Sequence, residues 1–320
     1  MQSLFVSQNE AGQRLDKLLS KYLNLAGKSF LYKMMRKKNI TLNGKKCDGS
    51  EKLVDGDEIK LFLSDETIEK FSQVKIQKVS NVSLDIIYED EHIILINKPA
   101  GMLSQKAKDS DESLVEYLID YLLTKNQISP EQLRSFRPSV CNRLDRNTSG
   151  LVVGGKSLIG LQIMSEVFKD RTIHKYYQCV VKGRVLKKQR INGFLAKDEK
   201  TNQVTVSTSE FPDSVPIATE YVPLDYYGDY TLLKVTLITG RTHQIRAHLS
   251  SIGHPIIGDY KYGDKKENEA AKKLYKVQSQ LLHSYQLIVP QLPEPLFYLS
   301  GKTFTAPLPP IYSAICADWR

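Results

Sequence analysis

A carboxylate between two arginines marks the part of this chain that is best suited to chemistry. Asp145 lies within the run NRLDRNTSG (142–150), in which small hydroxyl residues and a glycine follow the charged residues. Such a carboxylate can form a salt bridge in a surface loop, or it can act as a nucleophile or a base in a site. The choice between these interpretations depends on which other reactive residues the chain carries.

A second dense segment, TGRTHQIRAHL (239–249), combines two arginines, two histidines and a glutamine with an apolar pattern. It favours a shared polar site over an isolated salt bridge at Asp145. His243 and His248 also raise the alternative of a metal site. Their i, i+5 spacing places them on different sides of a helix, and no Asp or Glu lies between them, so we expect no metal.

Four segments, in this order along the chain, resemble the RluA-type pseudouridine synthase family: INKPAGM (96–102), NRLDRNTSGLVV (142–153), KYYQCVVKG (175–183) and TGRTHQIRAHLSSIGHPIIGDYKYG (239–263). The resemblance extends from residue 84 to about residue 290. It implies the isomerisation of uridine in RNA, in which the N1–C1′ bond breaks, the base rotates and C5 bonds to C1′. Because no atoms are lost or gained, we expect no metal, redox cofactor or nucleotide.

The resemblance also implies roles for three residues. Asp145 matches the family's catalytic aspartate and would attack the sugar or take its proton. Arg246 matches the motif arginine, whose charge opposes the rise in pKa that burial imposes on a carboxylate. Tyr177 matches the family tyrosine, whose ring can stack on the base and whose hydroxyl can assist proton transfer. The adjacent Tyr176 would point to the opposite face of the strand.

Other matching residues are expected to bind or position the substrate. Arg143 matches the arginine that fills the place of the flipped-out base. The family usually has His where this chain has Asn142, which cannot titrate near neutral pH, so we expect a positioning role there. Ile257 and Leu282 would line or support the base pocket, and core packing is the favoured interpretation for both. The expected substrate-binding residues are Asn142, Arg143, Thr148, Lys175, Arg241, His243 and Gln244.

Two alternatives to an isomerase remain open at this point. The run GLVVGGKS (150–157) matches the GxxxxGK[ST] loop of nucleoside triphosphatases. A phosphate loop must follow a buried strand, whereas here the strand-like Leu151–Val153 lies inside the motif and polar residues precede it. The other alternative is a non-catalytic RNA-binding factor in ribosome assembly. The set of Asp145, Tyr177 and Arg246 favours an enzyme, because binding alone does not require a lone carboxylate in a basic cleft.

Residues 1–63 predict a small unit of their own. Apolar residues recur at helical spacing over 13–23, and Ser29 is a suitable N-cap for a second helix with one cationic face. A strand at 40–42, an Asn-Gly turn and a strand at 58–63 follow. The runs RLDKLL, SFLYKMMRKKNITLNGKK and LVDGDEIKLFL resemble the S4 RNA-binding domain. This resemblance implies that six basic residues face structured RNA: Lys33, Arg36, Lys37, Lys38, Lys45 and Lys46.

The rest of the chain predicts an α+β catalytic domain with a mixed, mostly antiparallel sheet, the pseudouridine synthase fold. Strands are expected at 84–88, 93–97, 176–181, 204–208, 219–222, 231–237 and 286–289, and helices at 113–125 and 158–168. Several strands follow one another without long helical crossovers, which favours antiparallel pairing. We therefore predict an S4-like domain over 1–66, a polar linker over 67–83 and the catalytic domain over 84–320.

Composition agrees with an RNA partner. The chain has 320 residues, a net charge of +9 and a pI of about 9.1, and residues 1–63 carry 12 Lys and Arg against 7 Asp and Glu. No apolar run approaches the roughly 18 residues of a membrane span. The start resembles no signal peptide, and the four widely spaced cysteines fit a reducing cytoplasm. We expect a cytoplasmic monomer that acts on structured RNA, namely 23S ribosomal RNA or its precursor, with transfer RNA as the alternative.

Overall fold

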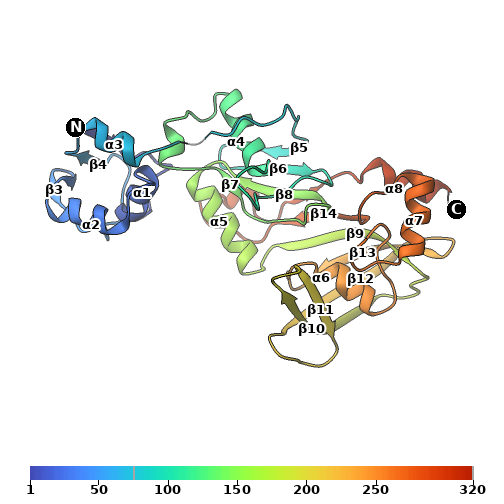
Figure 1. The fold of residues 1–320 in the computed structure, drawn as a ribbon. Helices are drawn as coiled ribbons and strands as arrows, with labels where there is room; N and C mark the ends of the chain where they lie inside the picture. The colour runs from blue at the N-terminus through green and yellow to red at the C-terminus, as the bar shows by residue number, and fades with distance from the viewer. Residues whose placement is uncertain (75, 319–320) are drawn as a thin grey trace. The chain divides into compact units, whose positions relative to one another are not determined.

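The computed structural model describes residues 1–74 and 76–318, which form two compact units (Figure 1). The first unit consists of Met1–Val82, Val115–Ser139 and Gly155–Gln162, and the second of Ser83–Leu114, Val140–Gly154 and the described chain from Ile163. Residues 115–139 thus belong to the first unit, although the sequence places them in the domain over 84–320. Within the first unit, Arg134 Nη1 donates a hydrogen bond to Tyr22 Oη at 3.3 Å, which joins these two segments.

A four-stranded antiparallel sheet and two helices form the amino-terminal part of the first unit. The strands lie in the order β1 (Gln2–Phe5), β4 (Glu58–Leu61), β2 (Ile40–Leu42) and β3 (Lys45–Lys46). Helices α1 (Leu15–Tyr22) and α2 (Lys28–Arg36) bury their apolar faces in one core with this sheet. Asn43 and Gly44 have φ angles of 50° and 72°, which are the left-handed values that the predicted tight turn requires.

Two details of this part differ from the predictions. Helix α2 begins at Lys28 after Gly27, so Ser29 lies in its first turn and does not cap it. Glycine is accepted at an N-cap because it adopts the extended backbone there without strain. Helix α3 (Asp65–Phe71) extends from the end of the predicted S4-like domain into the predicted linker, and its Ile68 is buried in the amino-terminal core.

One large, mostly antiparallel sheet dominates the second unit. Its strands lie in the order β11 (Gln203–Ser207), β10 (Gln189–Asp198), β12 (Val215–Tyr227), β13 (Tyr230–Leu237), β9 (His174–Lys182), β14 (Leu282–Ile288), β8 (Ser149–Gly155), β6 (Ile93–Lys98) and β5 (Ile86–Glu89). The short strands β7 (Ser139–Val140) and β15 (Thr303–Thr305) pair with β8 and β14. The predicted α+β class with a mixed, mostly antiparallel sheet is confirmed.

Helices accompany both units, and the two that the sequence predicted outside the amino-terminal part are present. They are α4 (Leu114–Thr124) and α5 (Leu158–Lys169). The described chain also contains α6 (Gln244–Ser251), α7 (Lys265–Tyr275), α8 (Pro310–Asp318) and two short 3₁₀ helices, η1 (Gln132–Arg134) and η2 (Phe297–Leu299). Helix α6 contacts β10, β11 and β12, so the TGRTHQIRAHL segment is held against one end of the large sheet.

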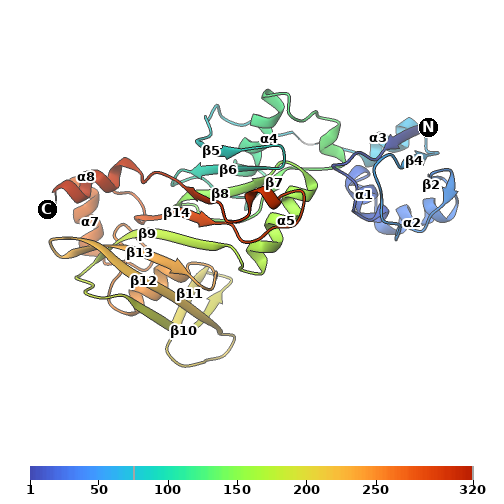
Figure 2. The same cartoon turned by 180° about the vertical axis from the view of Figure 1, so that it is seen from behind.

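The loop that carries Asp145 connects β7 to β8 and is called the reactive loop below. Strand β8 fixes where this loop ends. Strands β8 and β14 pair in parallel, with Ser149 opposite His283 and Gly150 opposite Ser284, and Figure 2 shows them side by side. A Cβ atom at Gly150 would lie 2.2 Å from the carbonyl oxygen of Ser284, and its φ is 110°. Glycine is therefore required here so that the two strands can approach.

The same strand decides against the nucleotide-binding alternative. All residues of β8 are buried, so the supposed phosphate loop is a strand in the sheet. A Cβ atom at Gly155 would lie 2.5 Å from Leu161 Cα, so this glycine admits the start of α5. Gly150 and Gly155 of the motif therefore allow close packing. The N–H groups of a strand do not converge on one phosphate as those of a phosphate-binding loop do.

Candidate active site

One cavity of about 720 Å³ is lined by every residue that the sequence predicts for catalysis or substrate binding in the second unit. These residues are Asn142, Arg143, Asp145, Thr148, Lys175, Tyr177, Arg241, His243, Gln244 and Arg246. They come from the β7–β8 loop, strand β9, the turn before helix α6 and the first turn of α6 itself. A volume of this size falls within the roughly 300–1,000 Å³ of small-molecule sites.

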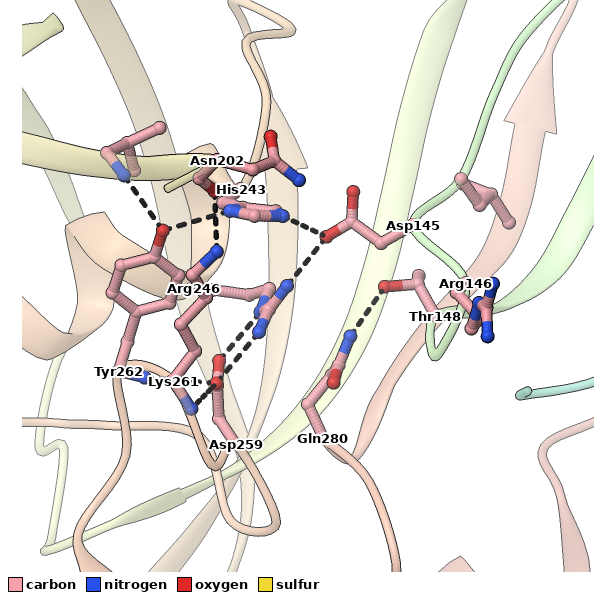
Figure 3. Close-up of polar contacts among 12 residues, drawn as sticks. Asp145, Arg146, Thr148, Asn202, His243, Arg246, Asp259, Lys261, Tyr262 and Gln280 are labelled. Atoms are coloured by element: carbon pink, nitrogen blue, oxygen red, sulfur yellow. Dashed lines mark hydrogen bonds and ion pairs between the residues drawn. The ribbon is translucent and has the colours of Figure 1, made fainter. Parts of the chain in front are cut away.

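Asp145 and Arg246 form the predicted ion pair, with Arg246 Nη1 2.9 Å from Asp145 Oδ2 (Figure 3). The other side of the guanidinium contacts Asp259, which receives hydrogen bonds from Nε and Nη2 at 2.7 and 2.9 Å. Asp259 is completely buried, and Arg246 is nearly so. The guanidinium therefore joins a buried carboxylate to the partly exposed carboxylate of Asp145, whose Oδ1 accepts no hydrogen bond from the described residues.

Charge outweighs burial in this ion-pair network. Burial alone would lower the pKa of Arg246, but hydrogen bonds and charge from Asp259 and Asp145 raise it above its ordinary value. Burial alone would raise the pKa of Asp259, but the hydrogen bonds and charge of Arg246 lower it. Both groups are therefore ionised at neutral pH, and the bidentate contact fixes the plane of the guanidinium.

His243 lies beside the same oxygen of Asp145. Its Nε2 is 3.8 Å from Asp145 Oδ2, and its Nδ1 is 2.9 Å from Tyr262 Oη (Figure 3). Tyr262 Oη also accepts the N–H of Val204 at 3.0 Å. Burial lowers the pKa of His243 below 6.5, although the charge of Asp145 opposes this effect. The imidazole is therefore neutral at pH 7.

Lys98 holds the backbone that follows Asp145. The residue is completely buried at the end of β6, and its Nζ donates to the carbonyl oxygens of Pro99, Met102 and Arg146 at 2.9, 2.9 and 3.0 Å. Burial lowers the pKa of Lys98 to about 7, whereas three carbonyl acceptors stabilise its ammonium form. The contact with Arg146 ties the reactive loop to the INKPAGM segment.

Ser104 holds the backbone that precedes Asp145. Its Oγ donates to the carbonyl oxygen of Leu144 at 2.8 Å and accepts the N–H of the same residue at 3.0 Å. Ser104 is buried and also lines the cavity. The residues on both sides of Asp145 are thus fixed through their main chains, which leaves the Asp145 side chain available for chemistry.

Tyr177 of β9 is a buried neighbour of the ion-pair network. Burial raises its pKa to about 12, so the phenol is protonated at neutral pH. Tyr176 does not line the cavity, in agreement with the prediction, and Lys234 Nζ lies 4.3 Å from the centre of its ring. Leu282 of β14 lines the cavity, whereas Ile257 is part of a hydrophobic core.

Asn142 acts on strand β8. Its Oδ1 accepts the N–H of Val153 at 2.8 Å, and its Nδ2 donates to the carbonyl oxygen of Leu151 at 3.3 Å. The amide therefore takes the place of a neighbouring strand at the start of the reactive loop. This arrangement supports a positioning role for Asn142.

Gln244 lines the cavity, but both the oxygen and the nitrogen of its side-chain amide form hydrogen bonds within the protein. Its Nε2 donates to the carbonyl oxygen of Ala218 and to Thr219 Oγ1 at 3.0 and 3.1 Å. Its Oε1 accepts from Thr239 Oγ1 and from the N–H of Arg241 at 2.8 and 3.1 Å. Gln244 thus fixes the turn that leads into α6, while the side chain of Arg241 is exposed.

The remaining predicted residues differ in how accessible they are. Thr148 is buried, and its Oγ1 accepts a hydrogen bond from Gln280 Nε2 at 3.3 Å (Figure 3). Lys175 is buried too, and burial, together with the charge of Arg171, lowers its pKa. Arg143 is exposed, so its guanidinium can reach a bound nucleic acid.

His248 does not join a metal site. Its Nδ1 lies 3.0 Å from Thr219 Oγ1, and burial lowers its pKa to about 4. Among the described residues, no group of three or more His, Cys, Asp and Glu side chains is arranged to hold a metal ion. In the same part of the chain, no helix has the length and apolarity to cross a membrane.

Four residues of the site were missed in the sequence: Lys98, Ser104, Asp259 and Tyr262. Lys98 lies in INKPAGM, and Asp259 and Tyr262 lie in HPIIGDYKYG, so a signal was present in segments noted only for their family resemblance. Ser104 follows the first of these segments and had no signal of its own. Their contacts depend on folding, which the residue types alone do not reveal.

Comparison with solved structures identifies the class of fold. Human RNA pseudouridylate synthase domain containing 4 matches 71% of this chain and 90% of its own, with a TM-score of 0.57 and 21% identity. Human RNA pseudouridylate synthase domain containing 1 matches 75% of this chain and 97% of its own, with a TM-score of 0.52 and 22% identity. The chain thus contains the predicted pseudouridine synthase fold.

Sequence comparison then identifies the family. The family model described as RNA pseudouridylate synthase matches residues 92–251. Ribosomal large subunit pseudouridine synthase C of Vibrio vulnificus is 30% identical over 275 residues, which cover 83% of this chain and 81% of the relative. Synthase D of Borreliella burgdorferi is 32% identical over 278 residues, which cover 84% and 81%. The chain belongs to the RNA pseudouridylate synthase family and to its RluA-type members.

Proposed function

We propose that this protein converts uridine to pseudouridine in the RNA of the large ribosomal subunit. The observation that carries the proposal is the asymmetry of Asp145, whose Oδ2 is bound by Arg246 while Oδ1 accepts nothing from the described residues. The names of the relatives, ribosomal large subunit pseudouridine synthases C and D, support the choice of RNA. Transfer RNA is the alternative substrate.

Asp145 performs the first step of the proposed reaction. Its Oδ1 attacks C1′ or takes a proton from the sugar, and the N1–C1′ bond breaks. The detached uracil rotates, and the C5–C1′ bond forms as the Asp145–C1′ bond breaks or as Asp145 returns the sugar proton. The proton on C5 is transferred to N1, so that atoms balance without a co-reactant. Arg246 keeps Asp145 oriented throughout, because it is itself fixed by Asp259.

The other cavity residues hold the nucleotide. Tyr177 lines the cavity, and its ring stacks on the detached uracil while the base turns. The target uridine must leave its stack to reach Asp145, and the exposed guanidinium of Arg143 fills the gap. Lys175 and Arg241 line the same cavity and bind the phosphates on either side of the target.

We further propose that the amino-terminal domain, over residues 1–66, supplies affinity for structured RNA in the manner of an S4 domain. Its support is a helix, a turn and two strands in the expected order, with exposed basic side chains. These side chains are Lys33, Arg36, Lys37, Lys38, Lys45 and Lys46. We also propose that the protein acts in the cytoplasm, which agrees with a ribosomal RNA substrate.

The test of the proposed function uses the purified full-length protein on transcripts of large-subunit ribosomal RNA and of transfer RNA. Pseudouridine is mapped by carbodiimide modification and reverse transcription. We expect new pseudouridines in the ribosomal RNA, formed in EDTA and without nucleotide on RNA that has been folded beforehand. Asp145→Asn should abolish them, with a loss of about 10⁴-fold or more.

Other outcomes of this experiment separate the alternatives. Modification of transfer RNA alone would replace the substrate but keep the chemistry. RNA binding without any pseudouridine in the wild-type protein would leave a non-catalytic binding factor. Near-normal turnover by Asp145→Asn would remove this residue from the mechanism.

A further inference from the structure

We propose that His243 is a positioning residue for Asp145: a neutral imidazole whose Nε2–H points at Asp145 Oδ2 and leaves Oδ1 as the reacting oxygen. The inference rests on the proposed function and adds a residue to it. It starts from the 3.8 Å between His243 Nε2 and Asp145 Oδ2, on the oxygen that Arg246 already binds. Two groups thus gather on one oxygen, and the other is left open.

The tautomer of His243 follows from a chain of hydrogen bonds. Val204 N–H donates to Tyr262 Oη at 3.0 Å, and the same oxygen lies 2.9 Å from His243 Nδ1 (Figure 3). Because Val204 occupies an acceptor site of the phenol, the phenolic proton is free to point at Nδ1. The imidazole proton is then on Nε2 and faces Asp145. In the opposite tautomer, the lone pair of Nε2 would face a carboxylate oxygen, which is repulsive.

The backbone and the rings support this orientation. His243 precedes α6 with φ 53° and ψ 14°, a left-handed conformation that few residues other than glycine adopt, although His is among the more frequent of them. Its ring meets that of Tyr262 edge to face, with 5.6 Å between the centroids. The His243 side chain is 8% exposed. Local strain at a site residue indicates that the surrounding structure determines where this side chain points.

The charges around His243 favour the neutral form. Burial lowers its pKa and is the largest effect, Asp145 and Asp259 raise it, and Arg246 and Lys261 lower it. The phenol of Tyr262 faces Nδ1, and burial raises its own pKa, so it remains a proton donor. Asp145 therefore has one cationic partner, Arg246, and one neutral partner. A second cation there would weaken the carboxylate as a nucleophile or base.

The same chain of contacts connects His243 to the β10–β11 hairpin. Val204 belongs to β11, and Lys261 Nζ donates to the carbonyl oxygens of Asn202 and Thr201 at 2.5 and 3.4 Å. Asn202 also lines the cavity. The orientation of the imidazole therefore depends on whether this hairpin is in place beside the substrate.

The experiment measures kcat, KM and the pH profile of kcat for four full-length variants on the RNA that the wild type modifies. In His243→Gln, the amide can donate to Asp145 and accept from Tyr262, so we expect kcat within about 3-fold of wild type. His243→Ala should lower kcat by about 10–100-fold with KM unchanged. Tyr262→Phe should resemble it, and His243→Ala combined with Tyr262→Phe should be no slower than His243→Ala alone.

The pH profile adds a readout that a merely structural residue would not move. Protonation of His243 places a cation on Asp145, so the acid limb of kcat should move to lower pH in His243→Gln. The matched control is His254→Gln, because His254 contacts the carbonyl oxygen of Lys182 and does not line the cavity. This control should keep both kcat and the wild-type profile.

Nitrogen NMR of the histidine side chains provides a measurement that does not depend on turnover. The His243 signal, assigned by its loss in His243→Gln, should show an imidazole protonated on Nε2 at pH 7, and Tyr262→Phe should disturb that state. A proton on Nδ1, full activity in His243→Ala, or additive losses in the double variant would overturn the inference. A wild-type protein that modifies no RNA would instead contradict the proposed function, and the tautomer would still be measured.

Discussion

The two oxygens of Asp145 have different surroundings, and the residues that create this difference are distant in the sequence. Oδ2 contacts Arg246 and faces His243, whereas Oδ1 is left to the cavity. Arg246 in turn depends on Asp259, a carboxylate with no exposed surface. A reactive acid is therefore oriented by a second acid that the substrate does not need to touch.

Replacing Asp259 by Asn should destabilise the protein and slow it. Loss of one partner from a buried ion pair costs about 3–5 kcal/mol, and Arg246 would be left with Asp145 alone. The pKa of Asp259 is lowered from 3.8, so its contribution to stability is complete above pH 3.8 and is lost as the pH falls through the lower folded pKa. The melting temperature against pH should thus show a gap to wild type at pH 7 that narrows only below about pH 4.

Asp264→Asn is the matched control for this change. Asp264 pairs with Lys182 near the surface and caps α7, a role that Asn fills equally well. It should alter the melting temperature far less. Equal losses in the two variants would contradict the special role of the buried pair.

Tyr177 can be tested by separating its ring from its hydroxyl. Because burial raises the pKa to about 12, the phenol is protonated at neutral pH and cannot begin the reaction as a base. Tyr177→Phe should keep the affinity for RNA and lose turnover, since the ring remains and the hydroxyl does not. Tyr177→Ala should also weaken binding by about 1–3 kcal/mol, the value of stacking on one base. Filter binding and single-turnover rates distinguish these results, and unchanged binding in Tyr177→Ala would contradict stacking.

The reactive residues of the site could be predicted from the sequence, whereas the residues that position them could not. Asp145, Arg246 and Tyr177 lie in dense runs of reactive residues, and the structure brings them to one cavity. Gln244 lies in such a run too, yet its amide is taken up by the turn before α6. Whether a polar side chain faces substrate or protein depends on its neighbours in space, and a single sequence does not state them.

Among the elements of the second unit, the end of β6 has the clearest influence on the reactive loop. Lys98→Met should remove the ammonium donor of three carbonyl oxygens, of which that of Arg146 keeps the N–H of Gly101 at 2.9 Å, at about 1–3 kcal/mol for each group that stays unsatisfied. Because the Arg146 carbonyl is one of them, kcat should fall together with the melting temperature. Lys182→Met is the control, since Lys182 is 40% exposed and does not line the cavity. Wild-type kcat in Lys98→Met would show that the loop holds its place without this lysine.

Elements were predicted where their apolar pattern was continuous. The hairpin of β5 and β6 and helices α4 and α5 appear close to their expected bounds. Strand β10 was missed because Asn192 and Gly193 interrupt its alternation. Helix α7 was missed because its buried residues are only Asn268 and Ala271, which give no apolar stripe at helical spacing. In both cases contacts with the rest of the fold stabilise what local preference leaves weak.

At the scale of the whole molecule, the chain has a candidate RNA-binding surface whose residues differ from those of the candidate active site. Lys33, Arg36 and Lys37 are exposed on and next to α2, and none of them lines the cavity. Replacing all three with Glu should weaken binding to long structured RNA and reduce the slope of log affinity against log salt by about 0.7–0.9 for each lost phosphate contact. The single-turnover rate at saturating RNA should stay within about 3-fold of wild type.

The matched control reverses three exposed lysines of α7, namely Lys265, Lys266 and Lys273. It makes the same change in net charge at another place. An equal loss of affinity in the two variants would mean that net charge, and not the surface of α2, determines binding. A collapsed rate at saturation in the α2 variant would mean that this domain helps to build the active site.

The parallel pairing of β8 with β14 makes the site one of the last parts of the chain to be completed. His283 Nδ1 lies 2.8 Å from Ser149 Oγ across 134 residues of sequence, and Leu282 lines the cavity. During synthesis, the basic helix α2 emerges long before β14 can dock beneath the reactive loop. A polypeptide released before residue 282 would still carry the α2 surface but would lack the part of the pocket that β14 supplies. Premature termination would then turn the product into a competitor that occupies RNA without modifying it.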